Sequence, residues 1–233
     1  MERIAKVMAR AGLCSRREAE RWIEDGRVEI NGTKITSAAL NVSANDKIIV
    51  DGKPLPSADK TRLWMFHKPT GTVTTNNDPE GRQTVFDLLP QDMPRVVTVG
   101  RLDMNTEGLL LLTNDGELAR KFELPANKWE RTYRVRVYGG VDEKKLKSLE
   151  NGVTIDGINY EPIKIEMENS GKGKNQWLRF TLTEGKNREI RKICEYIDLQ
   201  VSRLIRISFG PFELGSLPPE KTEEIPINQH DIG

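Results

Sequence analysis

Three acidic residues surround a run of four leucines in the stretch VGRLDMNTEGLLLLTNDG, residues 99–116. They are Asp103, Glu107 and Asp115. A carboxylate can act as a nucleophile, a general acid or a general base, so each of the three is a candidate for chemistry. Acids beside a buried strand also form turns, and the residue types alone leave both roles open. The spacing of Asp103 and Glu107 also allows a pair of carboxylates of the kind that glycosidases use.

A cluster of basic side chains lies at the N-terminus, where residues 1–17 contain a single acid, Glu2. Ser15 is spaced to form a capping box with Glu18, which would place two arginines in the first turn of a helix. Cations are disfavoured there by the helix dipole, so the pattern favours binding of an anion such as an RNA phosphate. Arginines that lie free in solvent are the simpler alternative. The candidate RNA-binding residues are Arg3, Lys6, Arg10, Ser15, Arg16 and Arg17.

A second group of basic residues lies in EGKNREIRKICEYIDLQVSRLIRI, residues 184–207. If a helix begins near Asn187, Arg188, Arg191 and Lys192 share one of its faces. A solvated amphipathic helix has the same pattern, so this cluster supports RNA binding only weakly.

The composition excludes several classes of protein. The chain has 233 residues, of which 36% are hydrophobic and 30% charged, with a net charge of +1 that does not by itself indicate a nucleic-acid binder. Cys14 and Cys194 match no metal-binding spacing, so we expect free thiols in a reducing compartment. No apolar run approaches the roughly 20 residues of a membrane span, and the N-terminus lacks a signal-type apolar core. We therefore expect a cytoplasmic protein without a membrane segment.

The pattern of elements predicts two domains. Residues 1–55 read as two short helices followed by short strands, and residues 56–62 as a polar linker that contains proline. In residues 63–228 strands outnumber helices without alternating regularly with them, which predicts an α+β domain. Residues 229–233 read as a loose tail.

Several motifs, taken in order, resemble those of a known family. The first 35 residues resemble the S4 RNA-binding domain. The segment SRREAERWIEDGRVEINGTKI is similar to that domain's pattern of two helices and a turn. The remainder resembles the RsuA/RluB group of ribosomal-RNA pseudouridine synthases. GRLDMNTEGLLLLTNDG is similar to the catalytic motif of that group, RTYRV to its tyrosine motif, and EGKNREIRKI with VSRLIRI to its third motif. NDPEGRQTVFDLLP is similar to a loop segment of the group. The resemblance covers nearly the whole chain, with no departure at the key positions.

The resemblance implies a mixed, mainly antiparallel sheet with flanking helices and a central catalytic cleft. It also implies an isomerase that breaks the bond between ribose C1′ and uracil N1, rotates the base and rejoins it through C5. Asp103 matches the nucleophile, and Arg191 the guanidinium that we expect in ion-pair contact with it. Tyr133 matches the tyrosine that lies against a flipped-out base, and Leu204 an apolar wall of the pocket.

The remaining expectations concern the partners of the protein. Arg101 and Arg188 are candidates for gripping the RNA around the target. Tyr133 also fits a core residue, since it shares a strand face with the alternating valines of RTYRVRV. The reaction is redox-neutral, so we expect no cofactor and no metal, and His67 and His230 are not expected to be metal ligands. We expect a monomer that acts on ribosomal RNA, specifically the 23S molecule or a pre-ribosomal particle, because the loop segments look most like those of the large-subunit enzymes.

Two other functions fit part of the pattern. A non-catalytic ribosome-assembly factor built on an S4 module would explain the basic clusters but not Asp103, since a carboxylate weakens phosphate binding. A glycosidase or nuclease that uses Asp103 and Glu107 would explain the acids, but nothing else in the chain suggests a sugar cleft.

Overall fold

The computed structural model describes residues 1–168 and 173–227, which fall into two compact units. The first unit consists of residues 1–62 together with the short segments 92–97 and 113–116. The second contains the other described residues from Leu63 onward. The predicted tail, residues 229–233 with His230, lies outside the described residues.

Two short helices begin the first unit, and local sequence explains where they start and end. In the second helix, Ser15 Oγ accepts from the Glu18 amide at 3.2 Å, and the Glu18 carboxylate accepts from the Ser15 amide at 2.7 Å, so the predicted capping box is confirmed. Gly12, just after the first helix, and Gly26, just after the second, have positive φ, the conformation in which helices commonly stop. The helices are α1 (Ile4–Arg10) and α2 (Arg16–Glu24).

Short strands complete the first unit. Its core consists of apolar side chains from both helices and from the strands, among them Ile4, Met8, Ile23 and Val28. A four-stranded sheet has the order β3-β2-β5-β6, and β1 pairs with β4. The strands are β1 (Glu2–Arg3), β2 (Val28–Ile30), β3 (Thr33–Ile35), β4 (Asn41–Val42), β5 (Ile48–Val50) and β6 (Lys53–Pro54).

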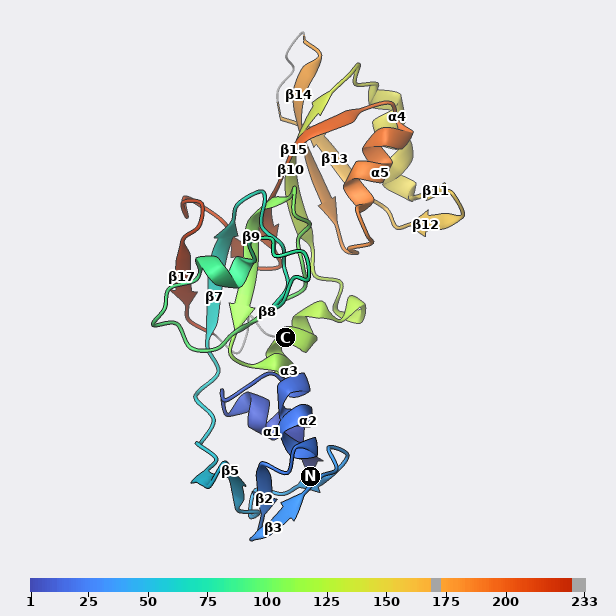
Figure 1. Cartoon of the computed structure of the whole chain (residues 1–233). Helices are drawn as coiled ribbons and strands as arrows, with labels where there is room; N and C mark the ends of the chain where they lie inside the picture. The colour runs from blue at the N-terminus through green and yellow to red at the C-terminus, as the bar shows by residue number, and fades with distance from the viewer. Residues whose placement is uncertain (169–172, 228–233) are drawn as a thin grey trace. The chain divides into compact units, whose positions relative to one another are not determined.

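A larger mixed sheet organises the second unit, with strand order β13-β14-β10-β15-β9-β7-β17 (Figure 1). In this sheet β14 is antiparallel to β13 and β10, β10 to β15, and β7 to β17, whereas β9 and β15 run parallel. The predicted α+β class with a mixed, mainly antiparallel sheet is therefore confirmed. The strands are β7 (Leu63–Lys68), β8 (Val97–Thr98), β9 (Glu107–Thr113), β10 (Arg131–Tyr138), β13 (Lys164–Met167), β14 (Asn175–Leu182), β15 (Gln200–Phe209), β16 (Phe212–Glu213) and β17 (Thr222–Ile225).

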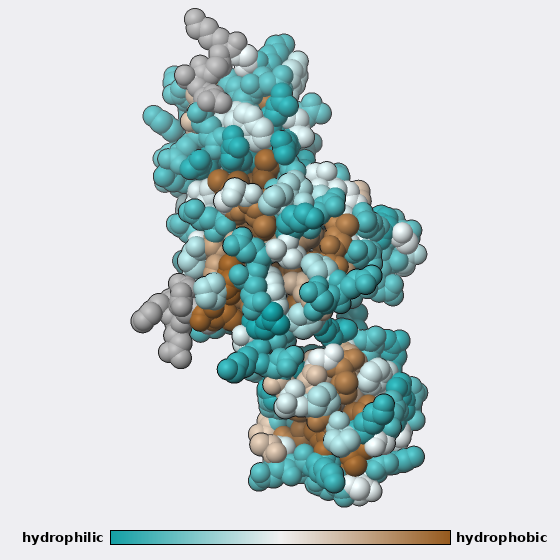
Figure 2. Space-filling model, turned by 90° about the vertical axis from the view of Figure 1, so that its left-hand side faces the viewer, coloured by the Kyte–Doolittle hydropathy of each residue, from teal (hydrophilic) through white to brown (hydrophobic). Residues whose placement is uncertain are grey.

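The helices of the second unit are short, and α4 and α5 lie beside the β14-β10-β15 part of the sheet (Figure 1). No helix within residues 1–168 and 173–227 is both long and apolar enough to cross a membrane. On the face drawn in Figure 2, hydrophilic side chains predominate and apolar surface is confined to patches between them. The helices are α3 (Gly116–Glu123), α4 (Glu143–Ser148) and α5 (Glu189–Tyr196), with 3-10 turns at Val85–Leu88, Pro125–Asn127 and Leu149–Asn151; β11 (Val153–Ile155) and β12 (Ile158–Tyr160) form a separate hairpin.

The parallel junction of β9 and β15 requires a glycine. Gly108 pairs with Arg206 and has a φ of +108°, which L side chains rarely adopt. A Cβ at this position would also overlap the backbone carbonyl oxygen of Arg206. The next four residues of β9, the leucine run, are completely buried. This strand therefore fixes the end of the preceding loop, residues 99–106, against the centre of the sheet.

Candidate active site

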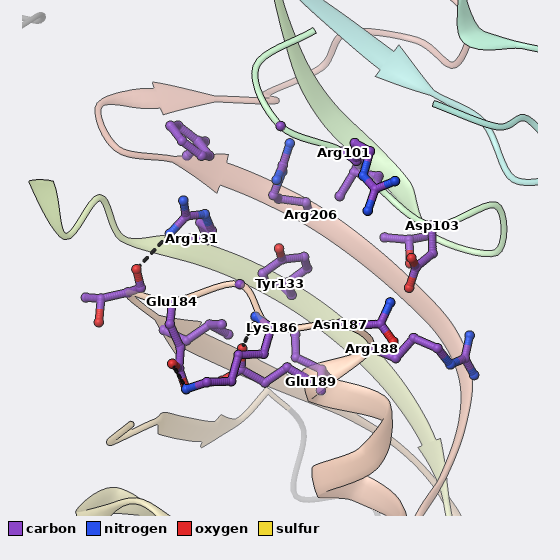
Figure 3. Close-up of a pocket in the computed structure, with 18 of the residues that line it drawn as sticks. Arg101, Asp103, Arg131, Tyr133, Glu184, Lys186, Asn187, Arg188, Glu189 and Arg206 are labelled. Atoms are coloured by element: carbon purple, nitrogen blue, oxygen red, sulfur yellow. Dashed lines mark hydrogen bonds and ion pairs between the residues drawn. The ribbon is translucent and has the colours of Figure 1, made fainter. Parts of the chain in front are cut away.

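A cavity of about 610 Å³ opens in the second unit between the loop 99–106, the strands β10 and β15, and the segment 184–189 (Figure 3). Figure 3 shows the loop on one side of the cavity, the segment 184–189 on the other, and the ring of Tyr133 between them. The predicted residues Arg101, Asp103, Arg188 and Leu204 line the cavity with Tyr133. Residues more than 100 positions apart in the chain thus share one site.

Asp103 lies in the loop that connects β8 to β9. Arg101 and Asp103 do not belong to a strand, because β8 ends at Thr98 and Gly100 has a φ of +67°. Both side chains nevertheless line the cavity, and Asp103 is half-buried. The backbone around Asp103 is anchored by side chains, since Thr74 Oγ1 donates to the Leu102 carbonyl at 2.8 Å.

A buried lysine that sequence reasoning missed lies beneath the same loop. Lys68, the last residue of β7, is 0% exposed, and its Nζ donates to the carbonyls of Thr106 at 2.9 Å, Met104 at 3.4 Å and Pro69 at 2.9 Å. Burial lowers the pKa of Lys68 to about 8, and Asp103 opposes this shift. The signal that could have found it is a lone cation ending the apolar strand LWMFHK just before a proline.

The expected ion pair between Asp103 and Arg191 is not formed, so this prediction is wrong. Among the described residues no ion pair within 4.0 Å involves Asp103, and the Arg191 Nη2 instead donates to the carbonyl of Asn105 at 2.7 Å. Burial and then the neighbouring Arg188 lower the pKa of Arg191, while Asp103 raises it. The guanidinium therefore binds the backbone of the loop, and its interaction with the Asp103 carboxylate is a longer-range electrostatic attraction.

Tyr133 and Leu204 lie on the same face of the sheet. Tyr133, on β10, is 8% exposed and its closest partner across β15 is Arg206. Leu204 precedes Arg206 by two residues, so alternation along the strand turns both toward the cavity. Sequence alternation allowed Tyr133 to be a core residue, and it is buried, but its ring also lines the open cavity.

The segment 184–189 carries a pair of carboxyl groups that the sequence did not single out. The Lys186 amide donates to the Glu189 carboxylate at 2.8 Å, and Lys186 Nζ forms an ion pair with Glu184 (Figure 3). Glu189 is 4% exposed; burial, and then the contact with Glu184, raise its pKa to about 8. These contacts hold a turn in which Arg188 has a φ of +53° and an exposed side chain at the cavity.

The other two acids of residues 99–116, Glu107 and Asp115, have different partners. Glu107 is the first residue of β9, is buried and pairs with Arg203. Asp115 accepts a hydrogen bond from Thr61 at 2.8 Å. Neither lines the cavity, so Glu107 does not provide Asp103 with a second catalytic carboxylate.

The basic residues of the first unit divide into two sets. Lys6 and Arg10 form ion pairs with Glu2 at 3.0 and 2.7 Å, so part of the expected basic stripe is neutralised. Arg3 precedes α1 and is exposed, as are Arg16 and Arg17 in the first turn of α2. The Ser15 side chain caps that helix.

The described part of the chain contains no group of three or more His, Cys, Asp or Glu side chains placed to hold a metal ion. His67 Nδ1 lies 2.7 Å from the carbonyl of Leu217. Cys14 and Cys194 are both free and buried.

Comparisons with known proteins agree with this arrangement. Residues 62–196 match the RNA pseudouridylate synthase family, and residues 2–48 match the S4 domain. The chain is 48% identical to an RNA pseudouridine synthase of Rickettsia felis over 97% of both proteins. It is also 48% identical to ribosomal large subunit pseudouridine synthase B of Salmonella typhimurium, over 91% of this chain and 75% of that protein. A crystal structure of a pseudouridylate synthase superposes with a TM-score of 0.69 at 25% identity, covering 100% of this chain and 98% of the other.

Proposed function

This chain belongs to the RNA pseudouridylate synthase family, and we propose that it isomerises a uridine of large-subunit ribosomal RNA to pseudouridine. The observation that carries the proposal is the placement of Asp103 at a cavity that the buried ring of Tyr133 also lines. A carboxylate and a flat, half-apolar surface are what a reaction on a flipped-out base requires.

In the proposed reaction Asp103 is the nucleophile. One of its oxygens bonds to ribose C1′ while the bond from C1′ to uracil N1 breaks, and the electron pair of that bond stays on the uracil. The ring then turns within the cavity, and C5 bonds to C1′ as the carboxylate leaves. C5 loses its proton and N1 gains one, so the reaction is an isomerisation that consumes no co-reactant.

The neighbouring side chains have supporting roles in this proposal. Tyr133 forms a platform for the uracil ring, and Leu204, which is also buried, forms an apolar wall. Arg191 positions the Asp103 loop through the Asn105 carbonyl. Arg101 and Arg188 are exposed at the cavity, which suits contacts with the phosphates on either side of the target.

The S4 domain provides the second contact with RNA. We propose that residues 1–55 form the RNA-binding domain, residues 56–62 a linker and residues 63–228 the catalytic domain. The exposed Arg3, Arg16 and Arg17 suit phosphate contacts. Such contacts offset the few kcal/mol that it takes to unpair and flip a base. We further propose a cytoplasmic monomer that acts on 23S rRNA or on a pre-ribosomal particle.

Gene deletion with complementation tests this function. Pseudouridine is mapped chemically across total rRNA of the deletion strain, and the strain is complemented with wild type, Asp103→Asn or Asp92→Asn. Asp92 is an exposed carboxylate outside the cavity, which makes its amide variant a matched control. We expect one site in 23S rRNA to disappear and to return with wild type and Asp92→Asn only. An unchanged map would refute the proposed activity and favour a non-catalytic assembly factor.

A further inference from the structure

Two arginines that line the cavity, Arg131 and Arg206, lie close to the ring of Phe209, which lines it as well. Their guanidinium carbons lie 4.8 Å (Arg131) and 5.3 Å (Arg206) from the centre of that ring. Arg131 Nη1 donates to the carbonyls of Trp129 at 3.0 Å and Thr183 at 2.7 Å. Because a guanidinium has donors in fixed directions, these contacts define which of them remain available.

Arg206 keeps an unused donor. The side chain is 3% exposed, and its Nε donates to the carbonyl of Leu109 at 2.7 Å. Its Nη2 is buried and has no hydrogen-bond partner among the described residues. Leaving a buried charged donor without a partner costs more than the roughly 1–3 kcal/mol of a neutral group. The unpartnered Nη2 therefore destabilises the folded state of the free protein.

The charge of these two arginines is also uncompensated. Within residues 1–168 and 173–227 neither guanidinium has a carboxylate within the 4.0 Å of an ion pair. Burial lowers the pKa of Arg131, and Arg206 acts in the same direction against the attraction of Tyr133 and Glu189. Since a buried, unpaired charge is strongly destabilising, a site that retains one is built for an anion.

A β-bulge brings Arg206 and Phe209 to the same face of the sheet. Thr132 pairs with Ser208 but Tyr133 pairs with Arg206, so Ile207 is an extra residue in β15. Without the bulge, Arg206 and Phe209 would alternate to opposite faces. With it, Arg206 stands directly opposite Tyr133, and the tyrosine hydroxyl points to the side where Arg206 lies in Figure 3.

The position of Arg206 suits contact with a base of the RNA rather than with a phosphate. Side chains directly opposite each other in antiparallel strands have Cβ atoms about 5 Å apart, so the edge of a ring lying on Tyr133 is within reach of Arg206. The exposed arginines of the site are Arg101 and Arg188, and these are the ones that a phosphate on the RNA backbone reaches first. The buried guanidinium is therefore matched to the uracil ring.

We propose that Arg206 is a catalytic residue whose Nη2 donates to a carbonyl oxygen of the uracil while the ring is detached from the ribose. This inference rests on the proposed isomerisation. When the C1′–N1 bond breaks, its electron pair is delocalised over N1 and the carbonyl oxygens, and the ring carries one negative charge. The charge disappears when C5 has bonded to C1′, C5 has lost its proton and N1 has gained one. A donor fixed before the reaction stabilises this anion more than neutral uridine, which accelerates the reaction without tightening RNA binding.

Single-turnover kinetics with saturating RNA test this role. Arg206→Ala is compared with wild type and with Arg179→Ala, a matched control on β14 whose arginine pairs with Glu168 outside the cavity. We expect Arg206→Ala to lower the rate by about 100- to 1000-fold, as for loss of one oxyanion donor, with RNA affinity changed less than about threefold. Added guanidinium chloride, against the same concentration of sodium chloride, is expected to restore part of the rate only in Arg206→Ala.

The opposite pattern would overturn the inference. Arg206→Ala could instead weaken RNA binding while the rate at saturating RNA stays unchanged. If the slope of log affinity against log salt concentration also falls by about one released counterion, Arg206 is a phosphate ligand. A rate within threefold of wild type also overturns it. These results are interpreted only if wild type forms pseudouridine, since a wild type without turnover contradicts the proposed function itself.

A measurement that does not use Arg206→Ala covers the case in which that variant does not fold. The probe is 5-nitrouracil, an acidic uracil whose absorbance reports ionisation of its ring. We expect wild-type protein to shift its ionisation to lower pH, and Asp103→Asn to do so at least as strongly because a neighbouring negative charge is removed. A titration curve that the protein leaves unchanged overturns the inference independently of turnover.

Discussion

Replacing Lys68 by methionine should remove a specific pH dependence of stability. The Lys68 ammonium is completely buried beneath the Asp103 loop, where three backbone carbonyls accept its hydrogen bonds. Burial lowers its pKa from 10.5 to about 8. The folded protein therefore releases this proton near pH 8, whereas the unfolded chain keeps it until about pH 10.5.

The size and sign of the effect follow from that difference. Between pH 8 and pH 10.5 the unfolded state binds one proton more than the folded state, so wild-type stability rises with pH. At about 1.4 kcal/mol for each pKa unit, the gain from this group is about 3 kcal/mol. Below pH 8 the full cost of burying the charge is present. Lys68→Met has no such titration, so the free energy of unfolding of wild type minus that of the variant should increase by about 3 kcal/mol from pH 7 to pH 10.5.

Urea unfolding at half-unit intervals of pH measures this difference. Lys164→Met is the matched control, because Lys164 is exposed and pairs with the exposed Glu166. The control should differ from wild type by a constant amount across the range. A wild-type minus Lys68→Met difference that stays constant within 1 kcal/mol would refute the reasoning. Single-turnover rates at pH 7.5 should also fall in Lys68→Met, because the carbonyls of Met104 and Thr106 lose their shared donor.

Three further variants test other contacts of the site. Arg191→Ala should lower turnover at least tenfold more than RNA affinity, measured by single-turnover kinetics and filter binding, because it frees the Asp103 loop; equal losses would contradict this. In wild type the folded state keeps the Glu189 proton to about pH 8 while the unfolded state loses it near pH 4.5, so the free energy of unfolding falls over that range. Glu189→Gln should abolish this fall, measured by urea unfolding at several pH values. Parallel pH curves for the variant and wild type would count against this explanation. Gly108→Ala should cost more than about 3 kcal/mol in thermal unfolding, because a Cβ overlaps the backbone of β15; Gly116→Ala, with open space around it, is the control, and similar melting temperatures would exclude the clash.

Much of the fold could be predicted because its signals are local. The strand Leu63–Lys68 matches the apolar run LWMFHK, and the start of α2 follows from the Ser15–Glu18 capping box. The apolar stretch VVTVGRL, residues 96–102, by contrast forms a strand over the two residues of β8, because the chain turns at Gly100 and the following backbone is held by Thr74. A hydrogen bond from a residue 28 positions away leaves no periodic signal in the segment that it shapes.

The sequence by itself determined the α+β class, the family resemblance and the motif residues that line the cavity, since turn residues, alternation and motif order are properties of neighbouring positions. Only the tertiary structure decided what surrounds Asp103. Arg191 reaches the loop backbone rather than the carboxylate, and Lys68 lies beneath the loop. A single extra residue in β15 brings Arg206 and Phe209 to the same face of the sheet, and the Arg206–Leu109 hydrogen bond joins positions 97 apart. Strand register and long-range contacts are fixed by packing across the whole sheet, so no local stretch of sequence contains them.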